Sequence, residues 1–216
     1  MKHHVERAVI LAAGIGEELR PVTFMTPTPL VRVHGRRMID SLIQDLNKNG
    51  IQEIYVVVDY LKEQFAYLET EYQDVKLVEN PYYDECDSIA SLYCVREHLE
   101  NAMILDGNQL IYDPVVLSTE FDGSGFNAVR ADQGDSWQLY GISRWTPEDG
   151  KKLRRHLEIE FEEKQNSHIS WEDIALSIYP KDYALTVREM CPDDVVSIDT
   201  LEELAAIESG YSALVE

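Results

Sequence analysis

Two glycines, Gly14 and Gly16, directly follow an unbroken apolar run at residues 8–13. Such a run, without polar alternation, is typical of a strand buried on both faces of a parallel sheet. Glycine permits positive φ and lets the backbone approach a ligand without a Cβ in the way. Ligands of open parallel sheets bind outside the carboxyl ends of the strands, so this turn is a candidate phosphate-binding loop. It is not the dinucleotide fingerprint, because GxGxxG needs a third glycine where Leu19 stands.

The elements that would hold this loop alternate between strand and helix patterns. Apolar residues at three- and four-residue spacing predict a helix from Met38 to Leu46, which Gly50 is placed to end. Thr200 with Glu203 forms a capping box that predicts the last helix. The other expected elements are strands at 54–58, 75–78, 102–105, 127–129, 137–143, 184–187 and 195–196, and helices at 61–72, 89–95, 115–121 and from Thr146 and Ser170 onward. This order predicts a doubly wound α/β fold with a mostly parallel sheet in a single domain, residues 1–216.

Length and charge exclude several classes of protein. The chain has 216 residues, a formal charge of −21 and no apolar run near the roughly 20 residues that span a bilayer. The negative charge argues against nucleic acid or an anionic membrane as a partner, since both require a positive face. The N-terminus leads straight into the first strand without room for a signal peptide, so we expect a cytoplasmic protein. Cys86, Cys94 and Cys191 lack CxxC spacing and are expected to be reduced thiols.

A longer pattern begins at the glycine loop. Residues 11–39, LAAGIGEELRPVTFMTPTPLVRVHGRRMI, resemble the signature LAAGxGxRLxPxTxxxPKPLVxVxGxPMI of the sugar-phosphate and choline-phosphate nucleotidyltransferases. Residues 80–83, 91–93 and 197–200 are similar to the bacterial CTP:phosphocholine cytidylyltransferase group, so the resemblance covers nearly the whole chain except around 131–137. It implies a Rossmann-like nucleotidyltransferase fold. It also implies transfer of a cytidylyl group from CTP to phosphocholine or a similar small phosphate acceptor, with Mg²⁺.

The resemblance assigns the nucleotide-binding positions, and two of its cations are replaced. Glu18 stands where the family carries its loop arginine, and Thr28 where it carries the lysine of PKPL. These are the catalytic positions, whose cations hold the triphosphate and offset charge that builds up during transfer. A carboxylate there reverses the sign of that contribution. The nucleotide-binding residues implied are Leu11, Ala12, Ala13, Gly14, Gly16, Asp59 (in place of a glycine) and Ser91.

The metal positions are altered too. By resemblance, Asn108 replaces the aspartate that binds Mg²⁺, while Asp199 keeps the position of the second ligand. Mg²⁺ prefers anionic oxygen, so an amide at Asn108 weakens such a site. Asp106, two residues earlier, points to the same face of its strand and is a substitute ligand. The simpler alternative is that Asp106 accepts hydrogen bonds from loop amides.

Four aromatic residues are candidates for contacts to the acceptor. By resemblance Tyr82 contacts the acceptor; the alternative is that it caps a loop against the sheet. Trp137 and Tyr140, with Trp145, would form a cation–π box for a choline headgroup. Aromatic residues on an alternating strand also suit a core. The chain is short around 131–137, which predicts a reduced lid on the acceptor side.

Two functional hypotheses remain. The first is a cytidylyltransferase that is weak or inactive, with a nucleoside triphosphate and a small phosphate acceptor as partners and Mg²⁺ as cofactor if it is active. The second is a non-catalytic scaffold, natural or engineered, used for binding or interaction and requiring no cofactor. Arg20 bears on both, because it either turns toward a phosphate or forms an ion pair with Glu17 or Glu18. The sequence does not determine the oligomeric state.

Overall fold

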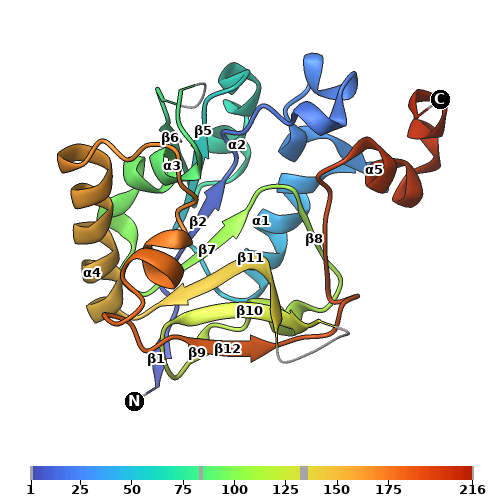
Figure 1. Ribbon diagram of the computed structural model, residues 1–216. Helices are drawn as coiled ribbons and strands as arrows, with labels where there is room; N and C mark the ends of the chain where they lie inside the picture. Colours follow the sequence, from blue (N-terminus) through green and yellow to red (C-terminus); the bar gives the residue numbers. More distant parts are fainter. Residues whose placement is uncertain (1, 83–84, 132–135, 216) are drawn as a thin grey trace.

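The computed structural model describes residues 2–82, 85–131 and 136–215, and its centre is a seven-stranded sheet (Figure 1). The middle strands β7, β2, β5 and β6 run parallel, while β11 is antiparallel to both of its neighbours. The predicted doubly wound, mostly parallel α/β fold is therefore confirmed. In spatial order the strands are β12 (Thr186–Glu189), β10 (Gly125–Arg130), β11 (Trp137–Trp145), β7 (Ala102–Asp106), β2 (Arg7–Leu11), β5 (Ile54–Val58) and β6 (Val75–Glu79).

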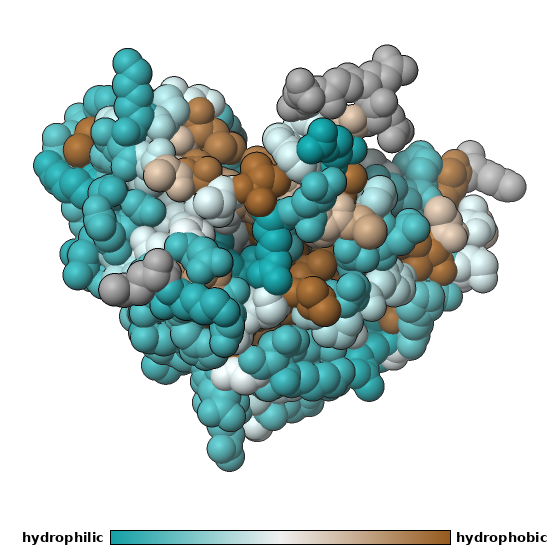
Figure 2. Space-filling view, turned by 90° about the horizontal axis from the view of Figure 1, so that it is seen from below, coloured by the Kyte–Doolittle hydropathy of each residue, from teal (hydrophilic) through white to brown (hydrophobic). Residues whose placement is uncertain are grey.

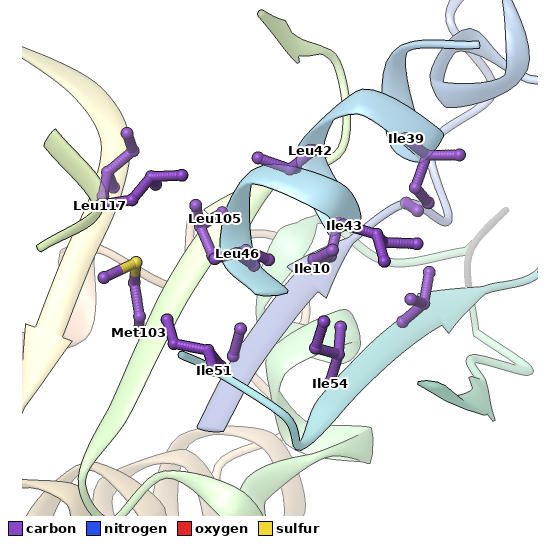
Figure 3. Packing of buried hydrophobic residues seen from close by; sticks show 14 of the residues in the cluster. Ile10, Ile39, Leu42, Ile43, Leu46, Ile51, Ile54, Met103, Leu105 and Leu117 are labelled. Atoms are coloured by element: carbon purple, nitrogen blue, oxygen red, sulfur yellow. The ribbon is translucent and has the colours of Figure 1, made fainter. Parts of the chain in front are cut away.

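Helices cover both faces of this sheet because its strands are apolar on both sides. On one face α1 (Met38–Lys48) packs its apolar stripe against Ile10, Ile54 and Leu105 (Figure 3). On the other face Val9 and its neighbours pack against α3 (Ser88–Cys94) and α4 (Pro147–Glu158). Successive residues of β2 thus enter different cores, as the period of two in a strand requires.

Local sequence signals explain where the helices begin and end. Gly50, at φ +86°, follows the end of α1 in the left-handed conformation that glycine tolerates. Thr146 caps α4 by accepting a hydrogen bond from the backbone N–H of Asp149 at 3.2 Å. Thr200 and Glu203 form the predicted capping box at the start of α5 (Leu201–Ile207).

Several predicted elements differ in the structure. The helix expected at 61–72 is two short ones, η4 (Lys62–Phe65) and α2 (Leu68–Glu71), preceded by Leu61 at φ +51°. The helix expected at 115–121 is η6 (Pro114–Leu117) followed by the strand β9 (Glu120–Phe121). The predicted short crossing at 131–137 falls mostly outside the described residues. The remaining elements are β1 (His3–His4), η1 (Glu17–Leu19), η2 (Val22–Phe24), η3 (Thr28–Leu30), β3 (Arg32–Val33), β4 (Arg36–Arg37), η5 (Arg96–His98), β8 (Gln109–Ile111), η7 (Ile159–Glu163), η8 (Ile174–Ile178), β13 (Val195–Ser197) and η9 (Ser209–Leu214).

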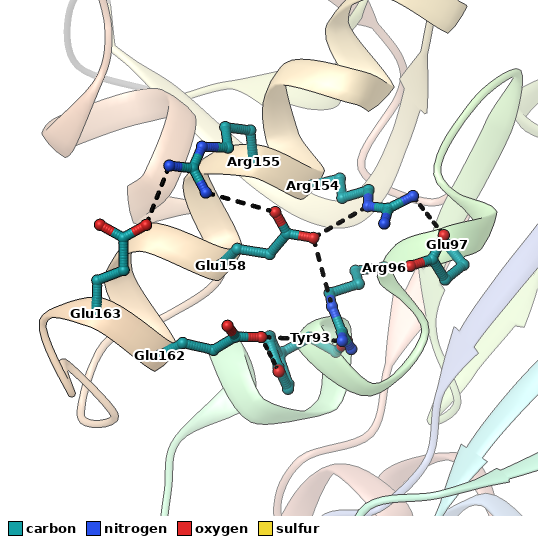
Figure 4. Close-up of polar contacts among 8 residues, drawn as sticks. All are labelled: Tyr93, Arg96, Glu97, Arg154, Arg155, Glu158, Glu162 and Glu163. Atoms are coloured by element: carbon teal, nitrogen blue, oxygen red, sulfur yellow. Dashed lines mark hydrogen bonds and ion pairs between the residues drawn. The ribbon is translucent and has the colours of Figure 1, made fainter.

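The outer face of α4 carries an ion-pair network (Figure 4). Arg154 contacts Glu158 at 3.1 Å and also pairs with Glu97 of η5, while Arg155 contacts Glu163 at 3.0 Å. Exposed pairs of this kind contribute about 0 to 1 kcal/mol each. Among the described helices, none has the length and apolar character needed to cross a membrane.

Candidate functional site

A pocket of about 300 Å³ lies at the carboxyl ends of β2 and β7. The turn after β2 and the residues after β7 meet there because the two strands are paired and parallel. The structure thus brings together most of the residues that the sequence assigned to nucleotide and metal, and adds Leu19, Pro29 and Ile198. The pocket is lined by Leu11, Ala12, Gly14, Gly16, Leu19, Thr28, Pro29, Asp106, Asn108, Ile198 and Asp199.

The glycine turn owes its shape to Gly16. This residue has φ +67°, and a Cβ added to it would lie 2.2 Å from the Thr28 hydroxyl oxygen. Its carbonyl oxygen accepts a hydrogen bond from the Thr23 hydroxyl at 2.6 Å, which ties the turn to the following segment. No described residue accepts a hydrogen bond from the backbone N–H groups of Gly14 and Gly16. Successive free N–H groups in such a turn form a concavity that suits an anion.

Positive charge is missing from this pocket. Glu18 is exposed, and Thr28 is 8% exposed with a hydroxyl oxygen that has no hydrogen-bond partner in the described part of the chain. Arg20 forms an ion pair with Glu17 at 3.0 Å, which is the alternative predicted for it. None of the described residues that line the pocket is a lysine or an arginine. The pocket therefore combines anion-binding backbone geometry with acidic side chains.

The nearby arginines are engaged elsewhere. Arg32 donates to the carbonyl oxygen of Gly35 at 2.8 Å, and Arg37 lies 3.8 Å from Asp40. Arg36 donates to the side chain of Gln44. In this arrangement they do not replace the family cations.

Asn108 and Asp199 are joined by a hydrogen bond. The Asn108 amide nitrogen donates to Asp199 Oδ1 at 2.8 Å and to the carbonyl oxygen of Ile198 at 3.2 Å. The antiparallel pairing of β8 with β13 brings these two positions together. Burial, together with the negative charge of Glu203, raises the pKa of Asp199, while the Asn108 hydrogen bond lowers it. The amide thus partly offsets the unfavourable environment of the carboxylate.

Asp106 faces the same pocket without a favourable partner. Its carboxylate has no hydrogen bond or ion pair among residues 2–82, 85–131 and 136–215, so it does not cap loop amides there. Burial, with the negative charges of Glu172 and Asp199, raises its pKa to about 7. Gly141, at φ +59°, makes room for it, because a Cβ there would lie 1.9 Å from Asp106 Oδ2. This contact was not predicted from the sequence, although a glycine inside a strand often marks close approach and could have located it.

These donors do not fit Mg²⁺. The ion requires near-octahedral coordination by hard oxygen, usually including carboxylate. Asn108 turns its N–H group toward Asp199, so both groups are occupied by each other. Within the described residues no three His, Cys, Asp or Glu side chains are grouped so that they could hold a metal ion.

A second pocket of about 580 Å³ lies on the other side of Asp106 and Asp199, which line both. Tyr140 is the one predicted acceptor residue among its described lining residues. Two further carboxylates, of Glu172 and Glu203, lie there. The pocket is lined by Asp106, Gln138, Leu139, Tyr140, Gly141, Glu172, Pro192, Val195, Val196, Ser197, Asp199, Glu203, Ala206 and Ile207.

The other predicted aromatic contacts lie apart from both pockets. Trp137 stacks under the guanidinium of Arg130 at 5.0 Å. Trp145 is 0% exposed in the core, so it does not complete a cation–π box. Tyr82 is 39% exposed, and its ring packs edge-on against Phe161 at 5.2 Å. Phe161, rather than the sheet, is thus the packing partner of Tyr82.

Three predicted nucleotide contacts do not line the pockets either. Ala13 is buried in the core behind the turn. Asp59 forms an ion pair with Lys62 at 3.5 Å. Ser91 is buried and accepts a hydrogen bond from the Asn80 amide at 3.0 Å.

Comparison with known proteins relates this chain to nucleotidyl transferases, among them two cytidylyltransferases. Residues 7–119 match the Nucleotidyl transferase family. The chain is 31% identical to the 2-aminoethylphosphonate cytidylyltransferase of Lancefieldella rimae, over 94% of this chain and 92% of that protein. It is 27% identical to the choline-phosphate cytidylyltransferase of Streptococcus pneumoniae, over 94% and 96%.

Solved structures agree with the sequence relatives. The CTP:phosphocholine cytidylyltransferase from Streptococcus pneumoniae superposes with a TM-score of 0.83 at 27% identity, covering 94% of this chain and 97% of that one. The inositol-1-phosphate CTP transferase from T. maritima superposes with a TM-score of 0.74 at 17% identity, covering 100% and 97%, which supports the fold alone.

Proposed function

This chain belongs to the nucleotidyl transferase family, and we propose that its pocket is a cytidylyltransferase site in which transfer is weak or absent. The substrates of that site are CTP and a small phosphate acceptor, phosphocholine or a similar compound. The names of both relatives support this class, since each transfers a cytidylyl group to a small compound that carries phosphorus.

The hydrogen bond from Asn108 to Asp199 carries this proposal. By family resemblance these positions belong to two carboxylates that share Mg²⁺. Here an amide N–H occupies the space between them at 2.8 Å, and no bridging cation is required. A metal would have to break this bond and would gain only a neutral amide oxygen from Asn108, which is a poor ligand for Mg²⁺.

The replacement of the family arginine and lysine by Glu18 and Thr28 also weakens the transfer reaction. A preorganised charged contact to the transition state contributes about 3 to 4 kcal/mol, or a factor of 10² to 10³ in rate. Glu18 and Thr28 remove two such contacts, although losses within one site do not add up simply. The backbone N–H groups of Gly14 and Gly16 remain as neutral donors to phosphate oxygens. They support weak nucleotide binding better than turnover.

A non-catalytic scaffold is the second candidate. The observation that favours it is the pairing of Arg20 with Glu17, which leaves the pocket without a substitute cation from its own loop. The same fold would then serve binding or interaction alone.

Restoring the family residues tests the proposal. Calorimetry with CTP and Mg²⁺, and pyrophosphate release with phosphocholine or 2-aminoethylphosphonate, would compare the wild type with the triple variant Glu18→Arg, Thr28→Lys, Asn108→Asp. We expect the triple variant to gain CTP affinity, and turnover by a factor of about 10² or more. A control with Thr70→Lys and Glu71→Arg makes the same two side-chain changes on the exposed surface of α2.

Two results would contradict the proposal. Wild-type turnover near the median enzyme rate of about 10 s⁻¹ would show an active enzyme. An unchanged CTP affinity in the triple variant would show that positions 18, 28 and 108 do not face the nucleotide.

A further inference from the structure

The pocket of about 580 Å³ between β11 and the segment that leads into α5 is strongly acidic. Its described lining contains four carboxylates, those of Asp106, Glu172, Asp199 and Glu203, and no lysine, arginine or histidine. It adjoins the pocket of the glycine loop, because Asp106 and Asp199 line both. A small ligand that occupies the two pockets together would place one end at the glycine loop and the other end among the carboxylates.

The general acidity of the chain does not explain this arrangement. The chain has 40 acidic and 19 basic residues, and the face that Figure 2 shows is largely hydrophilic. Many acidic side chains on the surface are paired with a base: Arg154 contacts Glu158 at 3.1 Å (Figure 4), and Lys2 contacts Glu120 at 3.1 Å. None of the four pocket carboxylates has a basic partner of this kind in the described chain. The negative charge of the pocket is therefore not compensated by the protein.

Asp106 is the carboxylate that a ligand would serve best. The other three accept hydrogen bonds from neutral donors: Glu203 from the backbone N–H of Thr200, Asp199 from the Asn108 amide, and Glu172 from the Ser170 hydroxyl. Asp106 accepts none within the described residues, although protein encloses most of its carboxylate and the negative charges of Glu172 and Asp199 act on it. The residue is still partly exposed in the wall of both pockets, so a ligand can reach it. An enclosed carboxylate beside like charges is unfavourable until a donor or a cation pairs with it.

A divalent metal ion does not meet this need. Mg²⁺ requires about six oxygen ligands in octahedral geometry, whereas three of the four carboxylates are already engaged. In the described part of the chain no three acidic, histidine or cysteine side chains are grouped for a metal. An ammonium group requires less, because a single N–H group forms one hydrogen bond while the other negative charges act on it at longer range. An organic ammonium group thus fits where a metal ion does not.

We propose that this pocket selects an acceptor with a primary ammonium group, which donates a hydrogen bond to Asp106 while Glu172 supplies further negative charge. The inference rests on the proposed function, because it names the class of acceptor that the cytidylyltransferase site takes. A trimethylammonium group has no N–H to donate and binds best against aromatic faces. Tyr140 is the one aromatic residue among the described lining residues, and Trp137 and Trp145 lie elsewhere. The preferred acceptors are small phosphates or phosphonates that end in a primary amine, rather than phosphocholine.

Calorimetry of the full chain with phosphoethanolamine, phosphocholine and ethyl phosphate tests this inference, with and without CTP and Mg²⁺ at constant ionic strength. The first two ligands differ only in the methyl groups on nitrogen, and the third lacks the amine. We expect the wild type to bind phosphoethanolamine about tenfold or more tightly than phosphocholine, because hydrogen bonds between charged groups are strong. Asp106→Asn should remove most of this preference, and Glu172→Gln should reduce it severalfold. The control Asp74→Asn makes the same change of charge outside both pockets and should leave the preference unchanged.

Ethyl phosphate shows whether Asp106 acts on the ammonium group. It should bind Asp106→Asn at least as tightly as the wild type, because the variant removes a negative charge near the phosphate. An equal loss of affinity for ethyl phosphate and phosphoethanolamine would mean that the carboxylate only supports the fold, and would overturn the proposal. If Asp106→Asn does not fold, Glu172→Gln carries the test. Phosphocholine bound by the wild type as tightly as phosphoethanolamine, or no binding of any of the three ligands, would also overturn it.

The titration with CTP separates this inference from the proposed function. If the triple variant Glu18→Arg, Thr28→Lys, Asn108→Asp binds CTP and turns over but favours phosphocholine, the choice of acceptor is wrong and the proposed function stands. If no variant binds CTP while the wild type still prefers phosphoethanolamine, the proposed function is wrong and the ammonium site stands.

Discussion

Replacing Asn108 by aspartate exchanges the side-chain NH₂ group for an oxygen and hardly changes the size of the side chain. In the wild type the amide nitrogen donates to Asp199 Oδ1 at 2.8 Å. In Asn108→Asp two carboxylates face each other, and Asp106 adds a third at the same pocket. We expect the variant to be less stable than the wild type without metal, and to recover its stability on addition of Mg²⁺.

The size of the effect follows from the geometry. Two unit charges about 4 Å apart repel by about 1 kcal/mol in water and about 4 kcal/mol at an effective dielectric of 20. The Asp199 residue as a whole is exposed to solvent, although its surroundings desolvate the carboxylate enough to raise its pKa, so the lower part of this range applies. Loss of the hydrogen bond adds about 1 kcal/mol. A total of about 2 kcal/mol lowers Tm by about 4 to 8 °C in a chain of this size.

Thermal unfolding in EDTA and at rising Mg²⁺ concentration measures this difference. The control is Asn166→Asp, because the Asn166 amide also donates to a carboxylate, that of Glu160, at 3.0 Å. This control should lose stability as well, but without a response to Mg²⁺. If Asn108→Asp is as stable as the wild type in EDTA, or responds to Mg²⁺ no more than Asn166→Asp does, the assignment of this pair to the metal position is wrong.

Two further outcomes follow from backbone geometry and from burial. Gly141→Ala should destabilise the protein by about 2 kcal/mol, since a left-handed residue costs about 1 to 2 kcal/mol and the new Cβ would meet Asp106. Urea unfolding measures this loss, with Gly123→Ala as the control because its Cβ would meet nothing nearer than 3.7 Å. Equal unfolding midpoints for the two variants would contradict the prediction. Burial lowers the pKa of His156, so its contribution to stability is present above the unfolded pKa of about 6.5 and is lost as pH falls through the folded value. The free energy of unfolding of the wild type should therefore fall relative to that of His156→Gln as the pH is lowered from about 7.5 to 5.5. If the difference between the two proteins does not change with pH, burial does not disfavour the charged form of His156.

Much of the fold was predictable because its signals are local. An apolar run predicted β5 with its observed bounds, Ile54–Val58, and the glycine and capping signals located the ends of α1, α4 and α5. The helix expected at 61–72 is interrupted between η4 and α2, and a periodic pattern of apolar residues does not reveal that break.

The site was predictable only in part. Chain topology places the ends of β2 and β7 together, so the residues that follow them line one pocket as expected. The bond between Asn108 and Asp199 joins positions 91 residues apart, and no local spacing predicts the direction of that amide. Trp145 was equally ambiguous, because an aromatic residue on a strand suits a binding box or a core until the opposite face is known.

The replacements in the pocket are consistent with one another in electrostatic terms. With aspartate at position 108 and no metal, two carboxylates would repel in the folded protein; the Asn108 amide removes that repulsion and adds a hydrogen bond. With lysine at position 28, a long cation would have to lie beside Gly16, where the small Thr28 side chain now packs against the turn. A ligand that binds only the folded state stabilises that state by mass action. A site whose charges are balanced only by its ligand therefore destabilises the folded protein when the ligand is absent. Asn108 and Thr28 relieve that dependence for Mg²⁺ and for polyphosphate together, and for this reason we interpret them as one coordinated change rather than separate losses.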